Sequence, residues 1–187
     1  DDGMRLTYAT LATFLKYPWL SADASESNKP GKYSAFVSEA SAFQEVATAT
    51  GLRELSPGRY CRHPLAYLME AADDFCYAII DLEDGLEMDL LHWDEVYALL
   101  QPALPDTREV SELIHSDLRD GRKAALLRGK IIERFIEAGV EAFVANHERL
   151  LLGRMEGDLM SIITFCPRAK RFKERAVEVS KSSQIVF

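Results

Sequence analysis

Three polar residues spaced four apart, Asp73, Tyr77 and Asp81, have the types and spacing best suited to chemistry in this sequence. On a helix they would lie within an arc of roughly 80° and a rise of roughly 12 Å. Hard divalent cations prefer oxygen ligands, so a carboxylate here could bind a metal, while the tyrosine offers a ligand a flat surface and a hydroxyl. The alternative is a solvated acidic face on an amphipathic helix, which the spacing alone favours.

The helix that must carry these residues is predicted over residues 64–83. Pro64 suits the first turn of a helix, and Gly85 suits a C-terminal cap. The helical period predicts two stripes on this helix. The apolar stripe that faces the core contains Leu68, Ala71, Ala72, Phe75, Ile79 and Leu82, and the polar stripe opposite it contains Glu70, Asp73, Tyr77, Asp81 and Asp84.

The apolar period is helical along almost the whole chain, which predicts an all-α fold with short connections. Residues 21–34 predict a mobile loop, residues 51–62 a connection, and the last four residues an edge strand or docking segment. The other predicted helices cover residues 6–17, stopped by Pro18, residues 38–50, 92–100, 107–120 and 122–146, and residues 159–180 with an interruption near Pro167.

The composition limits the possible functions. In 187 residues, 48% are hydrophobic and 28% are charged, which excludes a disordered polar chain. No apolar run approaches the length of about 18 residues that a membrane span needs, so no membrane partner is expected. The net charge of −8, from 30 acids and 22 bases, suits an acidic cation site. It leaves nucleic acid possible as a partner but not as the primary one.

The cysteines and the first residues bear on the compartment. Cys61, Cys76 and Cys166 are odd in number and widely spaced, which favours buried thiols in a reducing compartment. The start of the chain, DDGMRLTYAT, lacks the basic-then-apolar order of a signal peptide. The expected location is therefore the cytoplasm. The absence of methionine at position 1 suggests a trimmed chain or a fragment.

Two stretches resemble one protein family. The string RHPLAYLMEAADDFCYAIIDLEDG, residues 62–85, is similar to the deoxyguanosine triphosphate triphosphohydrolase (dGTPase) family of the HD-domain superfamily. The string LTYATLATFLKYP, residues 6–18, resembles the preceding helix of that family, and LRGKIIERFIEAG extends the resemblance over most of the chain. The resemblance implies the C-terminal portion of an HD-domain-like helical bundle. Its catalytic helix would lie at about residues 64–83, and its helical C-terminal region would begin at about residue 107.

The resemblance also implies an activity and a role for five residues. A deoxynucleoside triphosphate, dGTP first, would be hydrolysed to the deoxynucleoside and inorganic triphosphate. The family's metal site is H…HD…D, and its last aspartate begins a D-x3-Y-x3-D pattern. Asp73 is thus the implied metal ligand, Tyr77 packs against the deoxyribose where a 2′-hydroxyl would clash, and Asp81 accepts from the 3′-hydroxyl. Lys16 and Tyr17 match a Lys-Tyr pair that faces the triphosphate.

The chain departs from the family at the metal site. Asp74 is an alternative ligand by adjacency, although the register favours Asp73. One aspartate cannot hold a catalytic cation, so the resemblance implies a missing N-terminal part that supplies the other ligands, no catalytic residue in this chain, and no activity for the chain alone. The cation would be magnesium or manganese, or another transition metal, and the protein a homo-oligomer. None of the four histidines is followed by aspartate: His63, His92, His115 and His147.

Other functions remain open. A non-catalytic helical module that binds nucleotide or a partner chain is favoured by the absent histidines. Another HD-type phosphohydrolase is disfavoured by Tyr77 and Asp81. The bases of residues 168–175 predict a solvated face, with a subunit contact or a nucleic-acid patch as alternatives. A second group predicts a solvated basic helix end, with a phosphate or regulatory nucleotide contact as the alternative: Arg122, Lys123, Arg128 and Lys130.

Overall fold

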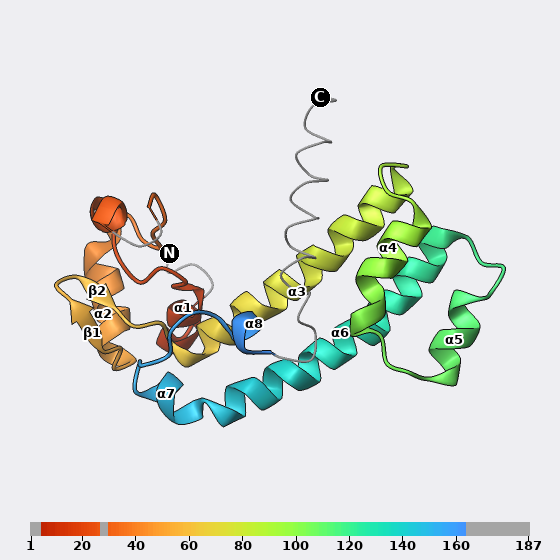
Figure 1. The fold of residues 1–187 in the computed structure, drawn as a ribbon. Helices are drawn as coiled ribbons and strands as arrows, with labels where there is room; N and C mark the ends of the chain where they lie inside the picture. Colours follow the sequence, from red (N-terminus) through yellow and green to blue (C-terminus); the bar gives the residue numbers. More distant parts are fainter. Residues whose placement is uncertain (1–4, 27–29, 164–187) are drawn as a thin grey trace. The chain divides into compact units, whose positions relative to one another are not determined.

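The computed structural model describes residues 5–26 and 30–163, and most of its regular structure is helical (Figure 1). This confirms the all-α, HD-domain-like prediction. The described residues divide into two compact units, one within residues 5–71 and 143–159 and the other within residues 72–142 and 160–163. The predicted helix beyond residue 162 and the predicted C-terminal strand lie largely or wholly outside the described residues. The α-helices are α1 (Tyr8–Phe14), α2 (Ala40–Ala49), α3 (Pro64–Glu87), α4 (Trp93–Leu100), α5 (Arg108–Ile114), α6 (Asp120–Ala145), α7 (His147–Leu151) and α8 (Leu159–Ile162).

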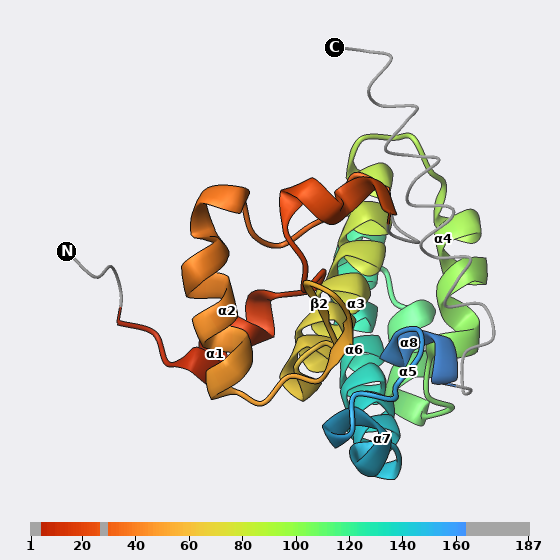
Figure 2. The same cartoon turned by 90° about the vertical axis from the view of Figure 1, so that its left-hand side faces the viewer.

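In the first unit, α1 and α2 lie side by side (Figures 1 and 2). The N-terminus of α1 is capped by Thr7, whose hydroxyl accepts a hydrogen bond from the Thr10 N–H at 3.2 Å. The helix ends at Phe14, earlier than the predicted residue 17. A residue before proline avoids the helical conformation, and the N–H of Tyr17 donates instead to the Ser34 hydroxyl at 2.8 Å.

Short elements occupy segments that were predicted to be irregular. Residues 21–34 contain a 3-10 helix, η1 (Ser21–Glu26), and a second one, η2 (Val37–Glu39), leads into α2. The predicted connection over residues 51–62 contains an antiparallel hairpin of β1 (Glu54–Ser56) and β2 (Arg59–Tyr60). Strands of two or three residues are too short to give an alternating pattern, so the sequence did not reveal them.

The first unit is completed by chain from far along the sequence. An Arg53 guanidinium nitrogen donates to the Gly153 carbonyl at 2.5 Å, and the Tyr67 hydroxyl donates to the Met155 carbonyl at 3.1 Å. Gly153 has a φ of +60°, and a Cβ there would lie 2.5 Å from the Cys61 sulfur. Only glycine fits so close to Cys61, so the packing of residues 153–155 against the rest of the first unit requires glycine at position 153.

Aromatic and aliphatic packing forms the core of the second unit, where α6 runs beside the C-terminal part of α3. The rings of Phe75 and Phe135 stack with centroids 4.4 Å apart, and Leu127 and Ile131 are fully buried. Gly139 of α6 is buried and faces the Phe75 ring, and a Cβ there would make an ordinary contact with that ring at 3.7 Å. Further along, a 3-10 turn, η3 (Gln101–Ala103), follows α4.

The predicted cap of α3 is wrong by four residues. Gly85 lies inside the helix, and the left-handed residue that ends it is Asp89, with a φ of +55°. The Leu90 N–H donates to the Gly85 carbonyl at 2.9 Å, and the Asp89 N–H donates to the Leu86 carbonyl at 3.3 Å. This is a Schellman motif, in which an aspartate takes the place that glycine usually fills.

Candidate functional site

The polar face of α3 carries the three residues predicted to do chemistry. Asp73 and Tyr77 are exposed, with 62% of Tyr77 accessible to solvent, whereas Asp81 is half-buried. Burial, and secondly the charge of Asp84, raise the pKa of the Asp81 carboxyl above its ordinary value. The three residues lie on successive turns of one continuous helix, so an elongated ligand beside α3 could contact a carboxylate, a ring and a second carboxylate.

The predicted core stripe of α3 is partly wrong. Its central apolar members are buried, but Ala72 is exposed and Leu68 only half-buried. Helical phase fixes which way a side chain points and not how much protein lies beyond it. The buried members of the stripe are Ala71, Phe75, Ile79 and Leu82.

A metal needs more ligands than this face provides. Asp73 offers one exposed carboxylate, and the neighbouring Asp74 is half-buried and engaged in an interaction of its own. Within residues 5–26 and 30–163, no three histidine, cysteine or acidic side chains are grouped so that they could hold a metal ion. These residues therefore do not form a metal site by themselves.

Glu70 departs most from its prediction. It was expected on the polar stripe, yet the residue is only 7% exposed. Its carboxylate forms ion pairs with the Lys16 ammonium at 3.1 Å and with the Arg62 guanidinium at 2.6 Å. Two bases from other segments cover this side of the helix, and they compensate the charge that they bury.

Lys16 and Tyr17, the predicted triphosphate pair, are half-buried in the first unit beside this cluster. The Lys16 ammonium lies 6.0 Å from the centroid of the Tyr17 ring, and Arg62 Nε donates to the Lys16 carbonyl at 2.9 Å. An open pocket of about 610 Å³ adjoins the cluster. Aromatic rings, two arginines and three acids line it, so its charge does not indicate one class of ligand: Tyr17, Trp19, Arg59, Tyr60, Arg62, Tyr67, Glu70, Glu156 and Asp158.

The predicted site residues fall into two groups. Lys16 and Tyr17 belong to the first unit, whereas Asp73, Tyr77 and Asp81 belong to the second. Lys16 and Tyr17 are adjacent, and the other three residues follow one another on successive turns of α3. The Glu70 and Arg62 partners of the first group were not predicted, although both lie within the strings that carry the family resemblance.

Each of the four histidines lies at, or contacts, a group close to it in the sequence. His63 precedes α3, and its Nδ1 accepts from the Leu65 N–H at 3.3 Å. Burial lowers the pKa of His63, which favours the neutral ring that this contact requires. His92 caps α4, while the exposed His115 and His147 contact backbone carbonyl groups of their own segments.

The basic cluster at the start of α6 is largely neutralised by nearby acids. Lys123 pairs with Asp120 at 3.6 Å, Lys130 pairs with Glu109 at 2.9 Å, and Arg128 pairs with Glu83. These pairs fit the predicted solvated helix end better than a phosphate or regulatory nucleotide contact.

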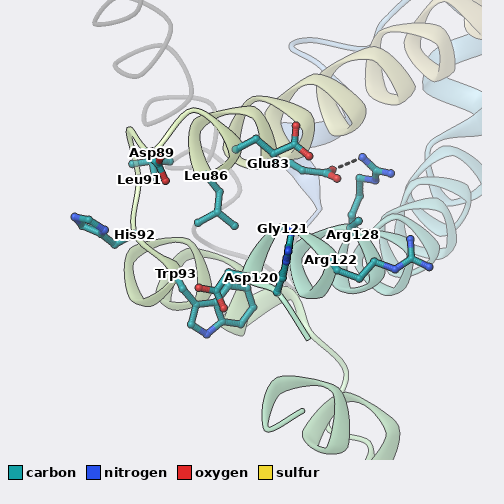
Figure 3. Close-up of a pocket in the computed structure, with 13 residues that line it drawn as sticks. Glu83, Leu86, Asp89, Leu91, His92, Trp93, Asp120, Gly121, Arg122 and Arg128 are labelled. Carbon is teal, nitrogen blue, oxygen red and sulfur yellow. Dashed lines mark hydrogen bonds and ion pairs between the residues drawn. The ribbon is translucent and has the colours of Figure 1, made fainter. Parts of the chain in front are cut away.

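A pocket of about 970 Å³ lies beside this cluster in the second unit (Figure 3). Arg122 and Arg128 line it from α6, and Arg128 points toward Glu83; Glu83, Asp89 and Asp120 line it as well. This mixture of charges does not indicate one class of ligand.

The fold is mostly helical and is consistent with an all-α, HD-like helical bundle. It is 48% identical over 165 residues to a deoxyguanosinetriphosphate triphosphohydrolase-like protein of Pseudomonas aeruginosa, covering 86% of this chain and 37% of that protein. A Synechocystis protein of the same name is 36% identical over 179 residues, covering 91% of this chain and 40% of the relative. The deoxyguanosinetriphosphate triphosphohydrolase of Serratia proteamaculans is 35% identical over 133 residues, covering 67% of this chain and 24% of that protein.

The chain is thus a relative of the deoxyguanosine triphosphate triphosphohydrolase family, as the resemblance of its sequence indicated. It spans about two fifths or less of the length of these relatives. No protein-family model matches it. None of the helices in the described part of the chain has the length and apolar character needed to cross a membrane.

Proposed function

We propose that this chain forms part of a deoxynucleoside triphosphate triphosphohydrolase that releases inorganic triphosphate, with dGTP as the first substrate to test. The observation that carries the proposal is the 48% identity to a relative of that name. It is supported by the D-x3-Y-x3-D residues, which share a face of α3 where a ligand can reach them. A homo-oligomer in the cytoplasm is the expected setting.

In this proposal each predicted site residue contacts one part of the nucleotide. Tyr77 packs against the deoxyribose, and Asp81 accepts a hydrogen bond from the 3′-hydroxyl. Lys16 and Tyr17 contact the triphosphate, where an ammonium group would offset phosphate charge. Asp73 contributes one ligand to a magnesium or manganese ion, and polypeptide outside the described residues supplies the rest.

Release of tripolyphosphate from dGTP, with added Mn²⁺ or Mg²⁺, tests the proposal in the polypeptide that the complete gene encodes. Asp73→Ala should abolish metal-dependent turnover and leave the helical content intact. Asp94→Asn, at an exposed aspartate of α4, is the control and should keep full turnover. Undiminished turnover in Asp73→Ala removes Asp73 from the site. Robust turnover by the 187-residue chain alone would show that no further ligands are needed.

The role of Tyr77 is tested by comparing dGTP with GTP. Tyr77→Ala should weaken the discrimination between the two sugars by about tenfold, because the clash with the 2′-hydroxyl is lost. Tyr77→Phe keeps the ring and should keep the discrimination. If both variants discriminate like the wild type, another residue reads the sugar.

A non-catalytic nucleotide-binding or oligomerisation module is the second candidate. It is favoured by the lack of a three-ligand metal group among the described residues. Under this alternative the complete polypeptide would bind dGTP without releasing tripolyphosphate.

A further inference from the structure

Glu70 is the one charged residue that is buried among the described residues whose exposure is known. Its two carboxylate oxygens contact different bases, Oε1 the ammonium of Lys16 and Oε2 the guanidinium of Arg62. Charge-assisted contacts on both oxygens hold a carboxylate in one orientation. The proposed function gives Glu70 no part, so this arrangement needs a separate explanation.

Arg62 extends the effect of Glu70 to the backbone of Lys16. Its Nε donates to the Lys16 carbonyl at 2.9 Å, and its guanidinium carbon lies 5.3 Å from the centroid of the Tyr67 ring. The Tyr67 hydroxyl is itself bonded to the Met155 carbonyl. Glu70 therefore fixes the Lys16 ammonium directly and, through Arg62, the backbone from which that side chain extends.

We propose that Glu70 is a positioning residue, which holds the Lys16 ammonium where the triphosphate of the substrate meets it. The inference rests on the proposed contact between Lys16 and the triphosphate. A lysine side chain is flexible and loses rotamer freedom when it binds, so a fixed carboxylate reduces that loss. Glu70 is an anion, and by charge alone it would repel a polyphosphate. Its benefit must therefore come from geometry.

Charge and geometry therefore predict opposite changes in polyphosphate binding when Glu70 is neutralised. The probe is inorganic tripolyphosphate, titrated into the full 187-residue chain by calorimetry. Glu70→Gln removes the negative charge and keeps the shape. Binding should weaken by about tenfold, the loss expected when a charge-assisted contact is disturbed. Unchanged or tighter binding overturns the proposal, because a role in charge balance alone predicts tighter binding. Absence of binding by the wild-type chain also overturns it.

A double-mutant comparison separates positioning from general stabilisation. Lys16→Ala should weaken binding, and Glu70→Gln should then add no further loss, because it acts through Lys16. Equal losses from Glu70→Gln in both backgrounds overturn the proposal. The matched control is Glu83→Gln, whose carboxylate pairs with Arg128 in the second unit, and it should bind like the wild type. If Glu70→Gln does not fold, Glu70→Asp keeps the charge but withdraws the carboxylate, and it should still weaken binding.

Turnover by the complete polypeptide tells the two proposals apart. If dGTP is hydrolysed and tripolyphosphate binds equally well with and without the Glu70 carboxylate, only the positioning role fails. If binding depends on Glu70 through Lys16 and no nucleotide is hydrolysed, the proposed activity fails and the polyphosphate contact stands.

Discussion

In the first unit, one buried carboxylate, that of Glu70, is shared by two bases, and the cluster adjoins an aromatic pocket. In the second unit, each of the described ion pairs joins one base to one acid, and the core is formed by stacked phenylalanines and aliphatic side chains. A shared carboxylate couples its partners, so a change at Glu70 affects both. A one-to-one pair can be lost with little effect elsewhere. Losing a carboxylate should therefore destabilise the protein more at Glu70 than at the one-to-one pairs of the second unit.

The largest loss is expected from Phe135→Ala. The Phe135 side chain is almost fully buried and stacks on Phe75, so truncation leaves a cavity in the second unit. Urea denaturation should show a decrease of about 3–5 kcal/mol in the free energy of unfolding. Phe14→Ala, at an exposed ring of the first unit, is the control and should change it little. Similar losses from both variants would contradict the assignment of the core.

Glu70→Ala comes next. It leaves two bases without their carboxylate, but both are partly exposed, with 26% of the Lys16 and 19% of the Arg62 side chain accessible. The expected decrease in the free energy of unfolding is about 2 kcal/mol, below the value for fully buried pairs. Glu83→Ala removes a one-to-one pair and should cost less. A larger loss from Glu83→Ala would reverse the contrast between the units.

His63 gives the first unit a dependence on pH. Burial lowers the pKa of this ring, so the unfolded chain takes up the proton more readily than the folded chain. This part of the stability is complete above the ordinary pKa of about 6.5 and is lost as the pH falls through the lowered value. His63→Asn keeps a capping acceptor that does not titrate, so its Tm should fall less on acidification. His115→Asn, at an exposed site, should follow the wild type, and identical pH profiles for all three proteins would exclude the role of His63.

Glu112→Ala should have the smallest effect. Its pair with Arg108 lies on the surface of α5, with 63% and 91% of the two side chains exposed. The expected change in the free energy of unfolding is below about 0.5 kcal/mol, and it should shrink further in salt. A loss as large as that of Glu70→Ala would show that exposure does not decide the value of these pairs.

Local sequence signals predicted the long helices well. Pro64 marked the first residue of α3, and its apolar spacing placed Phe75 and Ile79 in the core. The same period put Tyr77 on an accessible face. The C-terminal end of α3 was missed because Asp89, and not Gly85, adopts the left-handed conformation.

Those local signals could not predict contacts between residues far apart in the sequence. Helical phase grouped Glu70 with Asp73, yet Glu70 is buried by Lys16 from a distant segment and by Arg62 from the residues before α3. Neither the period nor the spacing of the acids encodes such partners. The predicted roles of the site residues come from the family resemblance, and they remain predictions.

The first unit closes through residues 143–159, and the bond from Arg53 to Gly153 joins positions 100 residues apart. During synthesis, the ribosome must therefore release nearly the whole described chain before this unit can be completed. Closing so long a loop costs entropy and slows folding. Until then the β1–β2 hairpin and α2 lack part of their packing, so they are exposed to chaperones and proteases.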